Sequence, residues 1–277
     1  METTKTGWER ENRTHFDEIV VNYDKARWEY PDGLFADIFA YAGAETGKMA
    51  LEIGAGTGKA TTPFLHAGYD VTAVEMGANM AAFLCDKYQK YTGFRVHNSA
   101  FEDAVLAHDR YDVVYAASAF HWVDAKIGCP KVFRLLKKGG TFALMRSNEI
   151  TADGEALYEA IQAAYEKHYY SYYTSKTRWR RKDNGDLKTP SGICEGFGFE
   201  DMSGFGFTDV ALQFYEKTLT YSADGYITLM DTMADKRGLP EQNRHALYEE
   251  MKAAIITHGG HINVDYIFTL YMGRKPL

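Results

Sequence analysis

The segment Leu51-Glu52-Ile53-Gly54-Ala55-Gly56-Thr57-Gly58-Lys59 is rich in glycine. It begins within the apolar run 49–53 and ends at the start of a segment of helical character, 59–67. This order predicts a strand, a tight turn and a helix. The glycines permit positive backbone dihedral angles and allow a ligand to approach the main chain closely. We therefore interpret the segment as a ligand-binding loop. The alternative is a chance glycine triplet in an ordinary turn, and the flanking strand and helix argue against it.

The alternation of apolar runs and helical segments continues on both sides of this loop. Two helical segments, 16–30 and 34–43, precede it. After it we expect strands at 71–75, 94–98, 111–117 and 141–146, with helices at 78–88 and 131–136. Strands that alternate with helices imply right-handed crossovers and a mostly parallel sheet with helices on both faces. The predicted fold class is therefore α/β.

The rhythm changes near Thr151. Residues 151–207 lack strand alternation, and we interpret them as a largely helical insertion between the fifth and sixth strands. Strands return at 210–215 and 264–272, on either side of a helical region at 223–257. We expect a single domain, 1–277, whose core comprises 33–148 and 208–277.

Composition narrows the class of protein. The 277 residues are 45% hydrophobic and 25% charged, which is typical of a globular protein, and the net charge of −7 disfavours nucleic acid as a partner. There is no apolar run of about 18 residues, and the N-terminus is polar, so we expect neither membrane insertion nor secretion. Cys85, Cys129 and Cys194 match neither a disulfide framework nor a zinc spacing, which favours free thiols in a cytoplasmic protein.

The acidic residues around the loop indicate the kind of ligand. The strand 71–75 ends in Glu75, which is placed to accept hydrogen bonds from both hydroxyls of a ribose. A dinucleotide fingerprint would need glycine where this chain has Lys59. Glu52 would repel a pyrophosphate but suits a cationic amino-acid group. A nucleoside that carries an amino acid therefore fits better than a dinucleotide, and an NAD(P)-dependent oxidoreductase of doubly wound fold is the alternative.

At this point the sequence resembles the class I S-adenosylmethionine-dependent methyltransferases over nearly its whole length. The matching segments are the loop 52–58, Glu75, 98–101, 111–115 and 133–140. Within that superfamily, the segments 119–124 and 23–31 resemble the methyltransferase type 11 branch that includes trans-aconitate methyltransferase. The resemblance implies S-adenosylmethionine as cofactor and a Rossmann-like sheet of seven strands, in the order 3-2-1-4-5-7-6 with the last strand antiparallel.

The resemblance also implies a set of cofactor contacts. It places the methionine part near Gly54, Gly56 and Ala117, within the loop that Gly58 completes, and the ribose at Glu75. It places the adenine near Met76, Ser99, Ala100 and Phe101. Many relatives carry aspartate at the position of Ser99, so this chain departs from the pattern there. Tyr23 and Arg27 share one face of a helix that in the family closes over the cofactor. The other interpretation of that pair is a core tyrosine beside a solvated arginine.

The candidate acceptor site rests on fewer residues. His121 follows the fourth strand at the sheet edge where ligands of open α/β folds bind, so it is our candidate catalytic base or acceptor contact. Trp122 is a candidate apolar wall, although packing between helix and sheet explains it equally well. In the insertion, Tyr169 and Arg178 are candidate acceptor contacts. The alternatives there are ordinary packing and a solvated charge run.

Together these features predict a methyltransferase that acts on a small-molecule acceptor. The insertion 151–207 is the expected acceptor lid, and the basic stretch 176–182 makes carboxylic acids a candidate class. A non-catalytic module that binds S-adenosylmethionine is the second alternative. We expect no metal, no nucleic acid and no membrane, and a monomer or homodimer.

Overall fold

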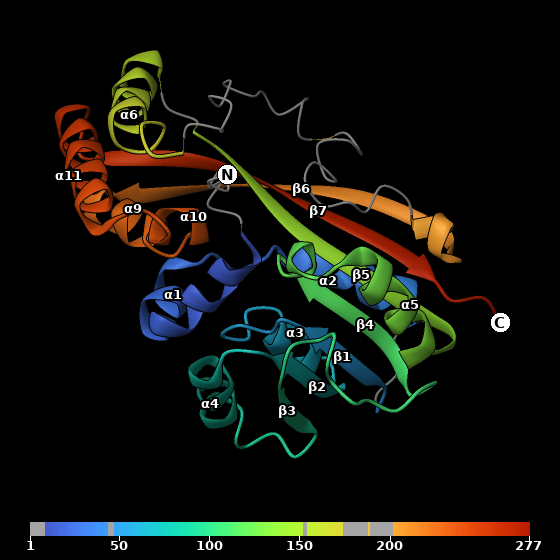
Figure 1. Ribbon diagram of the computed structural model, residues 1–277. Coiled ribbons are helices and arrows are strands. Elements are labelled where there is room, and N and C mark those ends of the chain that lie inside the picture. The colour runs from blue at the N-terminus through green and yellow to red at the C-terminus, as the bar shows by residue number, and fades with distance from the viewer. Residues whose placement is uncertain (1–8, 44–46, 152–153, 174–187, 189–201) are drawn as a thin grey trace. The chain divides into compact units, whose positions relative to one another are not determined.

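Seven strands form one sheet in the order β3-β2-β1-β4-β5-β7-β6 (Figure 1). The computed structural model describes residues 9–43, 47–151, 154–173, 188 and 202–277. The strands are β1 (Met49–Ile53), β2 (Asp70–Glu75), β3 (Phe94–Asn98), β4 (Tyr111–Ala117), β5 (Leu136–Thr151), β6 (Thr208–Ser222) and β7 (His261–Arg274). This is the predicted order, so the predicted fold class is confirmed.

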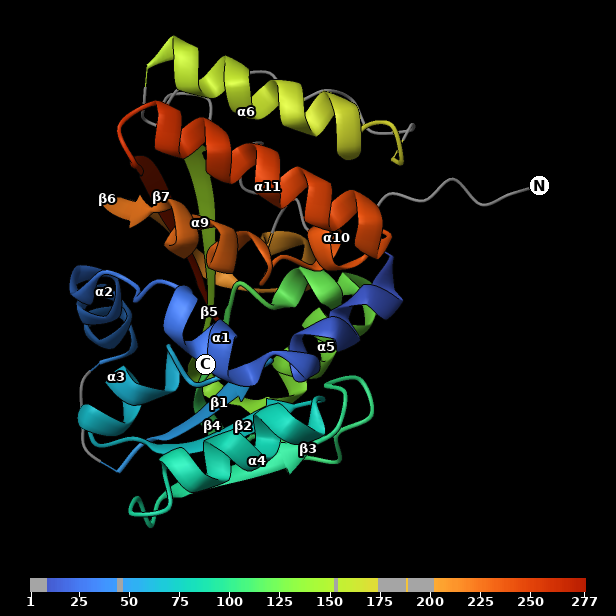
Figure 2. The same cartoon turned by 90° about the vertical axis from the view of Figure 1, so that its left-hand side faces the viewer.

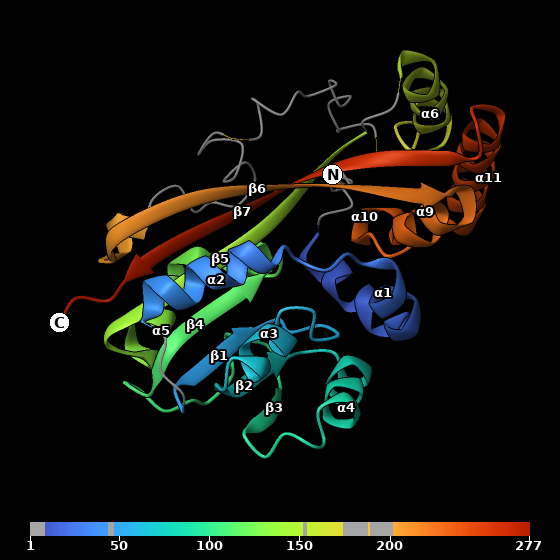
Figure 3. The ribbon, with the colours of Figure 1, turned by 180° about the vertical axis from the view of Figure 1, so that it is seen from behind.

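The first five strands run parallel. β1 pairs with β2 and β4, β2 pairs with β3, and β4 pairs with β5 (Figure 3). The last strand, β7, runs antiparallel to β5. Two hydrogen bonds at its end show this arrangement: Gly139 N donates to Lys275 O, and Lys275 N donates to Gly140 O. The carboxyl ends of β1, β2, β3 and β4 therefore meet at one edge of the sheet, which is where open α/β folds bind their ligands.

Helices occupy most of the segments between the strands. They are η1 (Arg10–Glu18), α1 (Val20–Ala26), α2 (Asp32–Ala42), α3 (Thr61–His66), α4 (Ala78–Lys87), η2 (Phe120–Trp122), α5 (Ala125–Leu135), α6 (Glu155–His168), η3 (Met202–Phe205), α9 (Ala223–Met230), α10 (Ala234–Arg237) and α11 (Glu241–Thr257). Among the described residues, no helix has the length and apolar character that are needed to cross a membrane.

Several predicted boundaries are wrong. The predicted helix 16–30 is a 3-10 helix followed by α1, because Ile19 has φ −131° and Arg27 is extended. α5 begins at Ala125 rather than 131, since the side chain of Asp124 accepts from Lys126 N at 2.9 Å and caps it. By contrast, the predicted helical region 223–257 has the predicted bounds, and it contains three helices.

The strands β5, β6 and β7 are longer than predicted. The sequence predicts that this strand begins after Gly139 and Gly140. In the structure, β5 includes both glycines. The register between β4 and β5 shifts there, and Gly139 has φ +75°, so the glycines form an irregularity inside the strand instead of ending it. A glycine pair is therefore compatible with a continuous strand.

The chain divides into two compact units. The first unit comprises the described residues within 1–27, 149–183 and 217–266, and the second comprises those within 28–148, 184–216 and 267–277. The chain passes from the second unit to the first inside β5, between Asn148 and Glu149. The predicted insertion 151–207 contributes to both units, and its role as a lid stays a prediction.

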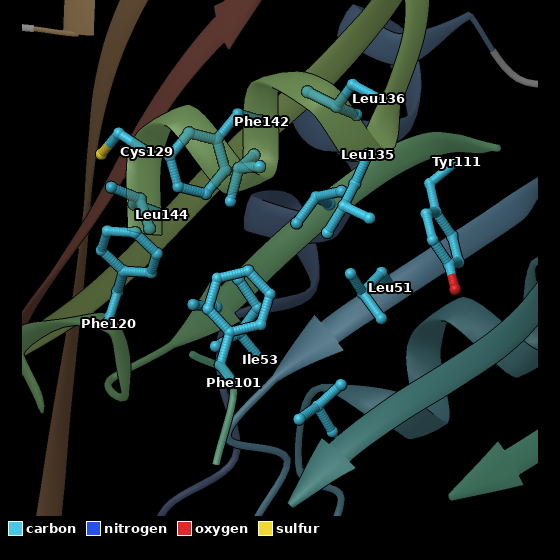
Figure 4. Close-up of a cluster of buried hydrophobic side chains, with 14 of the residues drawn as sticks. Leu51, Ile53, Phe101, Tyr111, Phe120, Cys129, Leu135, Leu136, Phe142 and Leu144 are labelled. Atoms are coloured by element: carbon cyan, nitrogen blue, oxygen red, sulfur yellow. The ribbon is translucent and has the colours of Figure 1, made fainter. Parts of the chain in front are cut away.

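The second unit contains an apolar core between β1, β4, β5 and α5 (Figure 4). Phe142 contacts both Phe120 and Phe207 there, with ring centroids 5.3 and 5.4 Å away respectively. On the other face of the sheet, the rings of Phe64 and Tyr115 stack at 3.8 Å. Burial of this apolar surface is the main stabilising contribution to the sheet that carries the loop.

The first unit has its own core, in which α6 packs beside α11, and α11 packs on α9 (Figure 2). The apolar stripe of α11 consists of Leu247, Met251 and Ile255, all buried, at helical spacing. Leu157 and Ile161 of α6 are also buried. This part of the chain therefore has its own apolar interior.

Candidate functional site

The glycine loop after β1 has the conformation that its sequence predicts. Gly54, Gly56 and Gly58 have φ values of +66°, +57° and +84°. A Cβ atom on Gly54 would lie 2.6 Å from the Cβ of Ala119. The hydroxyl of Tyr88 donates to Gly58 O at 2.7 Å and holds the end of the loop. The loop therefore needs glycine both for its dihedral angles and for its close contacts.

Replacing Gly54 with alanine is expected to destabilise the protein by about 1–3 kcal/mol, since a residue with a Cβ resists a positive φ and the new atom would clash with Ala119. Urea unfolding measures the change. Gly154→Ala is the matched control, because a Cβ there meets nothing within 4 Å. Equal stability of Gly54→Ala and the parent protein would contradict the constraint.

Glu75 connects the loop to the next strand. Its side chain is 7% exposed at the end of β2. One carboxylate oxygen accepts from Gly56 N and the other from Gly77 N, both at 2.8 Å. A carboxylate has about four acceptor positions, and these backbone groups occupy two of them. The sequence predicted a contact to a ribose but gave no sign that the same carboxylate orders the loop.

Glu52 lies in the interior beneath the loop. It is 1% exposed, and one of its oxygens accepts from Thr61 Oγ1 at 2.5 Å and from Tyr115 Oη at 2.9 Å. Burial raises the pKa of Glu52 to about 7, although these two hydrogen bonds act in the opposite direction. The carboxyl group is therefore balanced between its charged and neutral forms near neutral pH, and a cation placed beside it would favour the charged form.

The segment after β3 forms a wall beside Glu75. Ser99 N donates to Glu75 O at 3.0 Å, and the side chain of Asn98 donates to Met76 O at 3.1 Å. Ser99 Oγ is buried without a hydrogen-bond partner among the described residues. A buried hydroxyl with no partner is uncommon, and a bound ligand would satisfy it. Ala100 is half-buried beside it.

Phe101 continues this wall into the core. Its side chain is 4% exposed and belongs to the apolar cluster of the second unit. The ammonium of Lys131 donates to the carbonyl oxygens of Phe101, Glu102 and Ala104 at 2.7, 3.0 and 2.6 Å. These three bonds fix the main chain that follows Ser99.

The end of β4 contributes a feature that sequence reasoning missed. Ser118 follows Ala117 with φ +50°, which is rare for a residue with a side chain. Tyr30 donates its hydroxyl hydrogen to Ser118 Oγ at 2.9 Å, and Ser118 N donates to Met145 O at 2.8 Å. Backbone strain of this kind concentrates at functional sites. No sequence signal marks it, because serine is common in unstrained turns.

His121 and Trp122 follow on the short helix η2. Both are half-buried, and their ring centroids lie 5.1 Å apart. The candidate residues of the second unit thus come from the carboxyl ends of β1, β2, β3 and β4 and the segments that follow them. Among the described residues, no group of three or more histidine, cysteine, aspartate or glutamate side chains could hold a metal ion.

The other candidates belong to the first unit or lie outside the described residues. Arg27 donates from Nη2 to Thr232 O at 2.7 Å, and its guanidinium lies 4.8 Å from the ring centre of Tyr23. Tyr169 is 1% exposed and donates to Asp235 Oδ2 at 2.5 Å. Arg178 lies outside the described residues. The roles assigned to these four residues stay predictions.

The residues at the sheet edge fit a nucleoside that carries a cationic amino-acid group. The loop offers main chain without side chains, Glu75 offers acceptor atoms at the next strand, and Ser99 offers an unpartnered hydroxyl beyond it. Glu52 supplies a buried carboxyl group beneath the loop. The buried acidic groups Glu52 and Glu75 would oppose the charge of a pyrophosphate.

Comparison with known proteins gives concordant results. Residues 51–144 match the model of a methyltransferase domain family. An uncharacterized methyltransferase of Mycobacterium tuberculosis is 30% identical over 136 residues, which are 49% of this chain and 53% of that protein. The chain thus spans about half the length of the relatives of this group. An uncharacterized methyltransferase-like protein of Schizosaccharomyces pombe is 25% identical over 255 residues, covering 91% of this chain and 90% of the relative.

Solved structures share the fold. Phosphoethanolamine N-methyltransferase 2 of Haemonchus contortus, in complex with S-adenosyl-L-methionine, has a TM-score of 0.53 at 14% identity, covering 99% of this chain and 60% of that one. The YcgJ protein of Bacillus subtilis has a TM-score of 0.51 at 17% identity, covering 89% and 100%. Residues 51–144 therefore match a methyltransferase domain, and the sheet has the strand order that the resemblance to the class I S-adenosylmethionine-dependent methyltransferases implies.

Proposed function

We propose that the protein binds S-adenosylmethionine and transfers the methyl group to a small-molecule acceptor. The observation that carries the proposal is the pair of hydrogen bonds by which Glu75 joins the glycine loop to the turn after β2. This pair holds a carboxylate and an open stretch of main chain side by side, as a nucleoside with an amino-acid tail requires. The Haemonchus enzyme, which shares the fold, was solved with this cofactor.

Each part of the cofactor has proposed contacts in the chain. Glu75 binds the ribose, and Glu52 lies beneath the cationic end. The main chain of the loop and of the β4 end holds the methionine part, and the segments after β2 and β3 hold the adenine. The proposed cofactor residues are Tyr23, Arg27, Glu52, Gly54, Gly56, Gly58, Glu75, Met76, Ser99, Ala100, Phe101 and Ala117.

Methyl transfer mainly requires that the methyl group of the cofactor and the acceptor atom are aligned. The bound cofactor supplies a methyl group on a sulfonium, which is a good leaving group, so a dedicated base is needed only for some acceptors. A carboxylate acceptor needs none, whereas a hydroxyl or amine acceptor loses a proton. We propose that His121 accepts that proton. We propose that Trp122 forms part of the apolar wall that excludes water.

The acceptor is a small molecule in this proposal. The net charge of −7 argues against nucleic acid. Carboxylic acids belong in any screen because of the basic stretch 176–182, which lies outside the described residues. Cys85 and Cys129 are free thiols, in line with the cytoplasmic location that we propose. We expect a monomer or homodimer.

Calorimetric titration with S-adenosylhomocysteine, with NADH in parallel, tests the proposal before any acceptor is known. Saturable binding of S-adenosylhomocysteine alone is the expected result. Binding of NADH alone would overturn the proposal in favour of an oxidoreductase. Cofactor binding with no turnover on an acceptor panel of acids, alcohols and amines would indicate a non-catalytic module.

A further inference from the structure

Glu149, near the end of β5, carries a buried carboxylate oxygen with no hydrogen bond. Its Oε2 has no partner among the described residues. Removing such an oxygen from water without a donor destabilises a protein. Another buried carboxylate of the same unit is held through its other oxygen, because Asp235 Oδ2 accepts from Tyr169 Oη at 2.5 Å and from Lys236 Nζ at 3.1 Å. Glu149 differs from Asp235 in that none of these donors reaches it.

Three tyrosines lie on elements near this carboxylate. β7 lies next to β5 in the sheet and β6 lies next to β7. The hydroxyls of Tyr221 on β6 and Tyr266 on β7 are 3.0 Å apart, and the ring of Tyr226 on α9 lies 6.2 Å from that of Tyr221. Burial raises the pKa of each of these tyrosines, and the charge of Glu149 raises each further. Glu149 and the three tyrosines are therefore close enough to interact electrostatically.

Cations lie near Glu149, but their hydrogen bonds go to other groups. Burial raises the pKa of Glu149, the charges of Lys236 and Arg27 act in the opposite direction, and Asp235 raises the pKa further. Lys236 donates to Asp235, and Arg27 donates from Nη2 to Thr232 O. The unmet requirement is a hydrogen-bond donor for Glu149 Oε2.

We propose that Glu149, Tyr221, Tyr226 and Tyr266 form a recognition site for an acceptor with an amino group. A protonated amine donates N–H bonds to a carboxylate, and its charge is attracted by aromatic faces. This inference rests on the proposed function, because it names the class of the methyl acceptor. It assigns Glu149 to binding, not to chemistry, since the carboxylate orients the amine through a hydrogen bond.

The stability of Glu149→Gln separates a binding role from a structural one. Glu149→Gln removes a buried carboxyl group that lacks a donor, so it is expected to raise the melting temperature by about 2–4 °C. The reason is that a binding site which leaves polar groups unpaired in the absence of its ligand lowers the stability of the protein. Asp235→Asn is the matched control and is expected to lower the melting temperature, since Oδ2 of Asp235 accepts hydrogen bonds from Tyr169 and Lys236. A melting temperature of Glu149→Gln below that of the parent protein would overturn the inference.

Ligand titration tests the chemical class. Protein saturated with S-adenosylhomocysteine is titrated with benzylamine, ethanolamine and imidazole, and with benzyl alcohol and benzoate as matched neutral and acidic probes. We expect an amine to bind, and Glu149→Gln to weaken its binding at least about tenfold, the scale of losing a hydrogen bond to a charged group. Binding of benzoate in preference to every amine, or equal amine affinity in both proteins, would overturn the inference. Parent protein that fails to bind S-adenosylhomocysteine contradicts the proposed function instead.

Discussion

Replacing Glu52 with glutamine is expected to remove a pH dependence of about 3 kcal/mol from the free energy of unfolding. The pKa of Glu52 is about 7 in the folded protein, against 4.5 for an ordinary glutamate. The folded state therefore binds the proton more tightly than the unfolded state. The stability that this proton contributes is complete below pH 4.5 and is lost as the pH rises to about 7. Each pKa unit corresponds to about 1.4 kcal/mol, which gives the stated magnitude.

Urea unfolding at pH 5, 6, 7 and 8 measures this effect. The quantity of interest is the difference between the parent protein and Glu52→Gln, because other groups titrate equally in both. Glutamine still offers an oxygen to Thr61 and Tyr115, so the contacts of the carboxyl group are largely kept. Asp86→Asn, at an exposed position, is the control for loss of a charge. A difference that stays constant from pH 5 to 8 would refute the role of this proton.

Replacing Glu75 with alanine is expected to weaken binding of S-adenosylhomocysteine by about 1–3 kcal/mol, the usual scale for hydrogen bonds to a charged group. The expected loss has two sources. The carboxylate no longer offers the proposed acceptor to a ribose, and Gly56 N and Gly77 N lose the acceptor that the structure gives them. Calorimetric titration measures the affinity, and urea unfolding shows whether the variant remains folded.

A 2′-deoxyribose analogue of S-adenosylhomocysteine separates the two sources. If Glu75 binds the ribose, the parent protein loses affinity for the analogue, whereas Glu75→Ala binds both ligands equally, because the two changes remove one interaction. If the parent protein and Glu75→Ala lose the same affinity for the analogue relative to S-adenosylhomocysteine, Glu75 does not bind the ribose and only positions the loop. Unchanged affinity of folded Glu75→Ala would contradict both roles.

The sheet could be predicted because its determinants are local. Three of the strands from 49 to 117 (β1, β2 and β4) are short, mainly apolar runs bounded by turns, and the structure places all four within one residue of their predicted ends. The long strands were harder, because β6 alternates only partly buried residues with exposed ones. The periodicity of a strand is weak where neither face is fully buried.

Only part of the candidate site could be predicted from the sequence. The predictable part consists of the loop glycines and the acidic residues near the ends of strands. The positive φ of Ser118 depends on its contacts with Tyr30 and Met145, which are distant in sequence. Glu149 has no sequence signal, since its distinguishing property is the absence of a donor among residues brought together by three strands and two helices. Such properties arise from tertiary structure, so single-sequence patterns do not report them.

Lys131 gives the segment after β3 a chemical sensitivity of its own. The ammonium group of Lys131 donates hydrogen bonds to three main-chain carbonyl oxygens. It therefore holds the segment as a bound metal cation would hold a loop. Burial lowers the pKa of this lysine, which increases its share of the nucleophilic neutral form. Acylation would abolish the charge and leave the amide with a single N–H for three oxygens. The segment after β3 would then lose its order through a modification made on α5.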